Sequence, residues 1–138
     1  MAKMKDIVPI IVSSIEKGLE FELPVKGTSM LPLFNQDNTT VFLIKSLEYK
    51  KNDIVLYKRN DGHYVLHRIF KKKKDSYNML GDHQVSVEEG ILESQIICKV
   101  TKYKKNKKLY TMSGLRYKFY VLLWRSVFIR KIYFKVKK

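Results

Sequence analysis

The amino-acid sequence predicts a mainly β protein: a single antiparallel β-rich domain with a short N-terminal helix and a basic C-terminal helix. The chain has 138 residues, of which 45% are hydrophobic, so it is the size of one domain and can bury a core of its own. Short apolar segments separated by turn signals dominate the chain between residues 21 and 112. We assign residues 1–113 to the β domain and residues 114–138 to the C-terminal helix.

Apolar residues at helical spacing indicate the N-terminal helix. They fall on one helix face: Ile7, Ile10, Ile11 and Ile15. Asp6 can cap the N-terminus of this helix and Gly18 can end it, whereas Pro9 fits only in its first turn.

Several segments of the β domain have the composition of strands. They are Phe21–Lys26, Thr40–Ile44, Asp53–Arg59, His63–Phe70, Ser76–Gly81, Gln95–Tyr103 and Lys108–Met112. Turn-forming sequences such as NQDN at 35–38 and RNDG at 59–62 separate them. Short strands at this spacing favour antiparallel pairing.

The C-terminal segment has apolar residues on two sides of a predicted helix. One stripe comprises Leu115, Phe119, Leu122, Ser126, Ile129 and Tyr133, and the other comprises Tyr117, Tyr120, Trp124 and Phe128. One side can dock on the β domain. The other combines aromatic residues with the Lys/Arg of residues 115–138, which is typical of a helix at an anionic membrane surface. Packing on the chain's own domain or on a partner protein stays open as an alternative.

The formal charge of +15 is distributed unevenly. Residues 1–93 contain 14 Lys/Arg and all 13 Asp/Glu, whereas residues 94–138 contain the other 14 Lys/Arg and no acid. Such a block attracts polyanions, either nucleic acid or an anionic membrane. No stretch reaches the roughly 20 apolar residues of a spanning helix, so we expect a cytoplasmic or peripheral membrane protein without a transmembrane segment. The single cysteine, Cys98, favours a reducing compartment and a buried strand position.

The segment VKGTSMLPLF contains the candidate nucleophile, Ser29. A serine hydroxyl attacks a carbonyl only when a base takes its proton and N–H donors stabilise the oxyanion. Gly27 permits a tight turn before the serine. The amides of this serine block, at Gly27, Thr28 and Met30, are the candidate oxyanion donors.

The serine block and two later blocks carry a family resemblance. GTSMLP at 27–32, NDIV at 52–55 and GDHQ at 81–84 resemble, in order and content, the G-x-S-M-x-P, G-D-[IV]-V and G-D-N blocks of type I signal peptidases. That family shares its β-rich fold with self-cleaving repressors of the SOS type. The resemblance covers about residues 20–100 and implies a serine endopeptidase that cleaves signal-type or leader peptides, without a metal or cofactor.

The resemblance also implies the catalytic partners of Ser29. LHRIF places His67 where the endoplasmic-reticulum and sporulation-associated signal peptidases have H-R-[IV], so we expect His67 to be the general base. An imidazole with a pKa near ~6.5 needs little adjustment for that role, and an acid limb of activity near ~6–7 follows. Asp82 matches the acid that orients the histidine, and Glu88 matches a possible second acid.

Other candidate bases have simpler interpretations. His63 shares a strand face with His67 but lies about 13 Å along the strand, so we assign it to the hairpin surface. His83 is assigned to an exposed loop. Lys45 and Lys58 lack the R-V-I context of the lysine-dependent family members.

The expected partners are a peptide or protein substrate and an anionic membrane surface contacted by residues 115–138. Nucleic acid is not expected, because the sequence contains no recognised nucleic-acid-binding motif. Two alternatives stay open. One is a catalytically inactive interaction module of the same fold, and the other is a basic nucleic-acid-binding β protein, suggested by the charge and by the run Lys71–Lys74.

Overall fold

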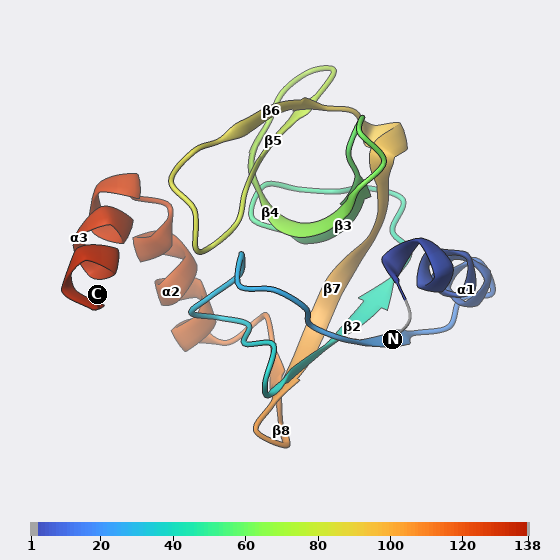
Figure 1. Ribbon diagram of the computed structural model, residues 1–138, viewed down its shortest axis with the longest axis horizontal. Coiled ribbons are helices and arrows are strands. Elements are labelled where there is room, and N and C mark those ends of the chain that lie inside the picture. The colour runs from blue at the N-terminus through green and yellow to red at the C-terminus, as the bar shows by residue number, and fades with distance from the viewer. Residues whose placement is uncertain (1–2, 138) are drawn as a thin grey trace.

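An eight-stranded antiparallel sheet forms the centre of the molecule in the computed structural model, which describes residues 3–137 (Figure 1). The strands are β1 (Phe21–Pro24), β2 (Thr39–Ile44), β3 (Ile54–Lys58), β4 (Tyr64–Lys72), β5 (Tyr77–Leu80), β6 (Glu88–Ile91), β7 (Ile96–Lys105) and β8 (Lys108–Thr111). Their order in the sheet is β1-β2-β7-β3-β4-β5-β6, with β8 paired to β7. The predicted mainly β fold is confirmed.

All the predicted strand segments form strands in the structure, within a few residues at their ends. The strand that the sequence analysis missed is β6, whose sequence EEGI has two acids and a glycine and therefore no strand signal of its own. It forms by antiparallel pairing with β5, in which Tyr77 lies opposite Ile91 and Met79 lies opposite Glu88.

The N-terminal helix α1 (Met4–Glu16) differs from its prediction in detail. It begins before Asp6, which lies in the first turn instead of capping the helix, and Pro9 lies inside it. The helix buries Val8, Ile11 and Ile15, while Ile10 is 58% exposed. Proline is tolerated here because the carbonyl that loses its partner belongs to Lys5, an exposed residue that water can reach.

The C-terminal segment forms two helices instead of the one predicted: α2 (Leu115–Trp124) and α3 (Val127–Lys137). In Figure 1 they lie on the side of the molecule opposite α1. The side of α2 that docks is the one with Tyr117, Tyr120 and Trp124, and Leu115, Phe119 and Leu122 are exposed. This reverses the expectation that the aromatic side would face lipid.

Two apolar clusters lie on the two faces of the sheet. The first includes Ile11, Met30, Phe34 and Leu56, under α1 and the loop that follows β1. The second lies between the strands β3 to β6 and includes Tyr57. Because side chains alternate along β4, Leu66 packs against the first cluster and Val65 against the second. His67 and Arg68 continue this alternation, so they lie on opposite faces of one strand.

Cys98 is buried in β7, as predicted. Burial raises the pKa of its thiol to about 12, which makes it an unreactive core residue. Among residues 3–137, no helix is both long enough and apolar enough to cross a membrane.

Candidate active site

Ser29 lies in a tight turn between β1 and β2, as predicted. Gly27 adopts φ +78°, a conformation that glycine accepts readily, and the Leu31 amide donates to the Thr28 carbonyl at 3.1 Å. The next residues anchor the turn, because Met30 is 2% exposed and Phe34 is fully buried. Ser29 itself is only partly buried, so its side chain stays accessible above an anchored backbone.

The loop after β5 holds the Ser29 turn from the other side. The His83 amide donates to the Ser29 carbonyl at 2.9 Å, and the Asp82 amide lies 3.4 Å from the Met30 sulfur. Gly81 has no space for a side chain: a methyl group there would lie 2.6 Å from the Ser29 carbonyl oxygen and 3.0 Å from Cδ2 of His67. One methyl group would therefore touch both residues, which places the imidazole next to the serine turn across Gly81.

His67 is 2% exposed and has its tautomer set by a chain of hydrogen bonds. Its Nδ1 lies 3.1 Å from the Tyr57 hydroxyl, which donates to Oε1 of Glu88 at 2.6 Å. A carboxylate only accepts, so the single hydroxyl proton points to Glu88 and the Tyr57 oxygen accepts from Nδ1–H. Nε2 of a neutral His67 then carries the lone pair. That is the atom bonded to Cδ2, on the edge of the ring that faces Gly81.

Burial, together with the nearby Arg59 charge, lowers the pKa of His67 to about 4, against the opposing effects of Glu88 and Asp82. His67 is therefore a neutral acceptor at neutral pH. Arg59 is also the residue that holds Glu88, with its Nε at 3.0 and 3.2 Å from the two carboxylate oxygens. The expected acid limb of activity moves accordingly, from ~6–7 to about 4.

The carboxylate of Asp82 does not contact His67, in contrast to its predicted role. It is fully buried and accepts two hydrogen bonds from Arg68, both at 2.9 Å, and one from the Tyr120 hydroxyl at 2.7 Å. Strand alternation explains the difference, because Arg68 faces the opposite side of β4 from His67. Asp82 thus anchors the loop that lies beside Ser29, whereas Glu88 supplies the acid on the histidine side through Tyr57.

Sequence reasoning missed Tyr57 and Arg59 as members of this site. Tyr57 lies two residues beyond Val55, the cross-strand partner of His67, and so shares its sheet face. The alternation of the segment DIVLYKR would have indicated that face, but only the β3–β4 register shows that Tyr57 reaches His67.

The candidate oxyanion donors differ in availability. The Gly27 amide donates to Oε1 of Gln36 at 3.0 Å and is therefore occupied. The amides of Thr28, Ser29 and Met30 form no hydrogen bond within residues 3–137. The hydroxyl of Ser29 likewise forms none within that range, and no hydrogen bond joins it to His67.

The C-terminal helices hold the loop at Gly81–Gln84 from outside. The Trp124 indole donates to the Asp82 carbonyl at 2.6 Å, and Nη1 of Arg130 donates to the carbonyls of Gly81 and Gln84 at 2.8 and 2.9 Å. Arg130 is 1% exposed. Residues far from the serine in sequence therefore fix the segment that separates Ser29 from His67.

A small cavity of about 130 Å³ opens beside Ser29. Its apolar lining comes from the segment that leads to the serine and from the neighbouring strands β3 and β4, and includes Val25, Met30, Leu56 and Leu66. The cavity can accept a small apolar side chain of a bound peptide.

The other candidate bases lie away from this site. His63 and Asp61 pair on the surface at 3.1 Å, and Lys45 pairs with Glu16 at 2.8 Å. Lys58 lies over the Tyr64 ring. His83 packs against Phe134 with ring centroids 4.6 Å apart, so its imidazole contacts α3. In the part of the chain that the structure describes, no group of His, Cys, Asp and Glu side chains could hold a metal ion.

Comparisons of this chain with protein-family models, with curated proteins and with solved structures found no match.

Proposed function

We propose that this protein is a serine endopeptidase in which Ser29 is the nucleophile and His67 is the general base. The observation that carries the proposal is the state of His67: a neutral imidazole with Nδ1–H directed to Tyr57 and its other edge at Gly81, next to the Ser29 turn. A base for serine needs a lone pair on the nitrogen nearest the hydroxyl and a fixed proton on the other.

The proposed chemistry uses these residues in turn. Nε2 of His67 takes the Ser29 proton as Oγ attacks the scissile carbonyl, and the amides of the serine turn stabilise the oxyanion. The negative charge that develops next to His67 raises the proton affinity of the imidazole during the attack. Tyr57 and Glu88 stabilise the imidazolium, which then gives its proton to the leaving amine, and water releases the acyl group from Ser29.

The proposed substrate is an extended peptide of the signal or leader type. The cavity next to Ser29 holds about 130 Å³, which suits a small apolar side chain close to the scissile bond. The resemblance of GTSMLP to the serine block of signal peptidases supports the same preference, since those enzymes cut after small side chains. A cleavage screen with a peptide library should therefore show products that end in a small residue such as alanine.

Labelling with a fluorophosphonate, followed by mass mapping, tests the nucleophile directly. We expect one adduct, on Ser29, that Ser29→Ala and His67→Ala each abolish. The double variant should be no less active than either single one, because the two residues act as a unit. Ser113, an exposed serine distant from His67 in sequence, provides the matched control through Ser113→Ala.

An adduct on another serine, or full labelling and cleavage by His67→Ala, would contradict the proposal. No labelling and no cleavage at any pH would instead support the inactive interaction module. The pH profile adds a second test, since activity should persist through mildly acidic conditions and fall as the pH approaches 4.

A further inference from the structure

The outer sides of α2 and α3 carry an unusual concentration of exposed apolar residues. Of the fifteen large apolar side chains exposed within residues 3–137, seven lie on these two helices. They are Leu115, Phe119, Leu122, Leu123, Phe128, Ile132 and Val136. Since large apolar surfaces of this kind are rare on monomeric proteins, they indicate an interaction surface.

The exposed residues form a stripe on each helix. On α2, Leu115, Phe119 and Leu122 recur at helical spacing and are 85, 62 and 70% exposed. On α3, Phe128 is 72% exposed and Val136 is 76% exposed. Neither stripe can turn inward, because the opposite sides of these helices already hold the loop at Gly81–Gln84 through Trp124 and Arg130.

Only cations accompany these apolar residues. Among the side chains whose burial the structure describes, the exposed charged residues of α2 and α3 are Arg116, Lys118, Lys131 and Lys135, and no acid occurs in the sequence after Glu93. The occupant of this surface must therefore be negatively charged and must also accept apolar side chains. A second copy of the chain would bring like charges together, and a nucleic-acid backbone would leave the leucines and phenylalanines without an apolar partner.

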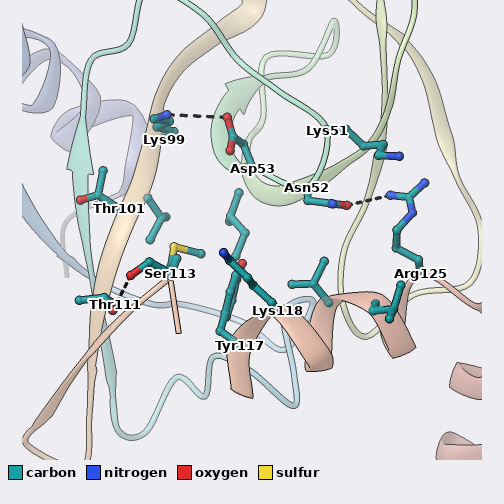
Figure 2. A pocket seen from close by; sticks show the side chains of 15 residues that line it. Lys51, Asn52, Asp53, Lys99, Thr101, Thr111, Ser113, Tyr117, Lys118 and Arg125 are labelled. Atoms are coloured by element: carbon teal, nitrogen blue, oxygen red, sulfur yellow. Dashed lines mark hydrogen bonds and ion pairs between the residues drawn. The ribbon is translucent and has the colours of Figure 1, made fainter. Parts of the chain in front are cut away.

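A basic pocket of about 650 Å³ adjoins the exposed stripe of α2 (Figure 2). Four cations line it, and its only acid is Asp53. Lys99 lies 3.9 Å from Asp53, and Arg125 donates to Asn52 at 2.8 Å, but Lys51 and Lys118 form no ion pair within the described residues. These two ammonium groups are available to an anion.

Lys118 and Leu122 belong both to this pocket and to the exposed side of α2. The pocket also has an apolar lining, which includes the buried side chains of Val100 and Val121. An anionic group bound at Lys118 would therefore lie directly beside an apolar stripe. Phospholipids have this combination of a phosphate and an adjoining hydrocarbon chain.

We propose that α2 and α3 bind an anionic phospholipid membrane. Their exposed apolar stripes enter the headgroup and acyl boundary, and lipid phosphates bind at Lys51 and Lys118. Each cation near such a surface contributes on the order of 1 kcal/mol, so a few acting together give reversible binding that depends on salt. The proposal does not depend on peptidase activity, since it concerns a different face of α2 from the one that contacts the loop beside Ser29.

Co-sedimentation of the full chain with vesicles tests the proposal. We expect binding to vesicles of phosphatidylcholine with phosphatidylserine, weak binding to phosphatidylcholine alone, and a steep loss of binding as salt is raised. Lys51→Glu combined with Lys118→Glu should weaken binding about tenfold or more. Leu122→Asp combined with Phe128→Asp should weaken it by a similar factor, because the charged side chains cannot enter the boundary region.

Matched control variants separate this surface from general attraction by net charge. Lys73→Glu with Lys74→Glu changes the same number of charges on the exposed hairpin after β4, and Leu47→Asp replaces a leucine that is 99% exposed elsewhere. Both should bind vesicles nearly as well as the natural protein. Absence of binding at low salt, equal loss in the controls and the α2–α3 variants, or binding to duplex DNA but not to vesicles would each overturn the proposal.

Discussion

The two faces of strand β4 each bury one ionisable side chain, and the two side chains differ in charge. Arg68 and His67 are neighbours in sequence and each is 2% exposed. Arg68 keeps its charge, because the Asp82 carboxylate raises its pKa against the lowering effect of burial, and it also donates to Tyr117 and to the Asn52 carbonyl. The His67 imidazole has a single hydrogen bond within residues 3–137, to Tyr57, and loses its charge.

Because of this difference, Arg68 can stabilise the loop beside Ser29, whereas His67 can accept a proton. A fully paired guanidinium stays protonated and cannot act as a base, but it can fix the loop that carries Gly81 and Asp82. A neutral imidazole with one free nitrogen can accept a proton. Asp82, the acid of the GDHQ block, therefore lies on the Arg68 face of β4 and holds the loop. Glu88 is linked through Tyr57 to the His67 face. The following variants test that division.

The largest expected effect is on stability, from breaking the Arg68–Asp82 pair. Asp82→Asn leaves a buried guanidinium without its counter-charge, so we expect the free energy of unfolding to fall by about 3–5 kcal/mol in denaturant titrations. The double variant Arg68→Met with Asp82→Leu should recover part of this loss, because it removes both charges. A loss of less than about 1 kcal/mol in Asp82→Asn would show that the pair is not the anchor of this loop.

The neutral state of His67 predicts a pH dependence of stability. The folded-state pKa is about 4, below the ordinary value of 6.5, so the unfolded chain binds the proton more tightly. Stability is therefore highest above pH ~6.5 and is lost as the pH falls towards 4, by an amount on the order of 3 kcal/mol.

Urea titrations between pH 7 and 4 measure this effect as the difference between the natural protein and His67→Gln. The variant should lose less stability over that interval. His63→Gln is the matched control for the loss of one histidine, since the His63 side chain is 78% exposed. An identical pH dependence in the natural protein and His67→Gln would show that His67 is not a buried neutral residue.

A smaller effect is expected from adding one methyl group between the two catalytic candidates. Gly81→Ala would place Cβ 2.6 Å from the Ser29 carbonyl oxygen, so either the serine turn or the loop must move. We expect a loss of about 1–3 kcal/mol in stability and a large loss of fluorophosphonate labelling. Gly114→Ala is the control, because a methyl group there meets nothing within 4 Å. Normal labelling of Gly81→Ala would argue against close approach of Ser29 and His67.

The smallest effect on stability is expected at Glu88, whose side chain is 30% exposed. Glu88→Gln should change the free energy of unfolding by less than about 1 kcal/mol. Its amide can donate, so the Tyr57 proton is no longer required to point away from His67 and the tautomer is no longer set. We expect kcat to fall about tenfold or more with little change in KM. Glu89→Gln, at the neighbouring exposed position, should leave kcat unchanged.

The sequence by itself determined the features that depend on short-range pattern. Alternation and turn residues located the strands from Phe21 to Thr111 except β6, and GTSM placed Ser29 in a tight turn because Gly27 accepts a positive φ. The same local rules placed Cys98 in a buried strand. These rules could not decide which of the two apolar sides of α2 packs on the β domain, because both sides have a similar apolar pattern.

Only the tertiary structure decided which side chains meet. Asp82 and Arg68 are 14 residues apart, Tyr57 and Glu88 are 31 apart, and Arg130 lies 49 residues from the Gly81 carbonyl that it binds. Each of these contacts depends on strand register and on which face of β4 a residue occupies, and a change of one residue in register would exchange the roles of His67 and Arg68. The same holds at the break between α2 and α3 at Arg125 and Ser126, where Arg130 binds both the Trp124 carbonyl and the Gln84 carbonyl.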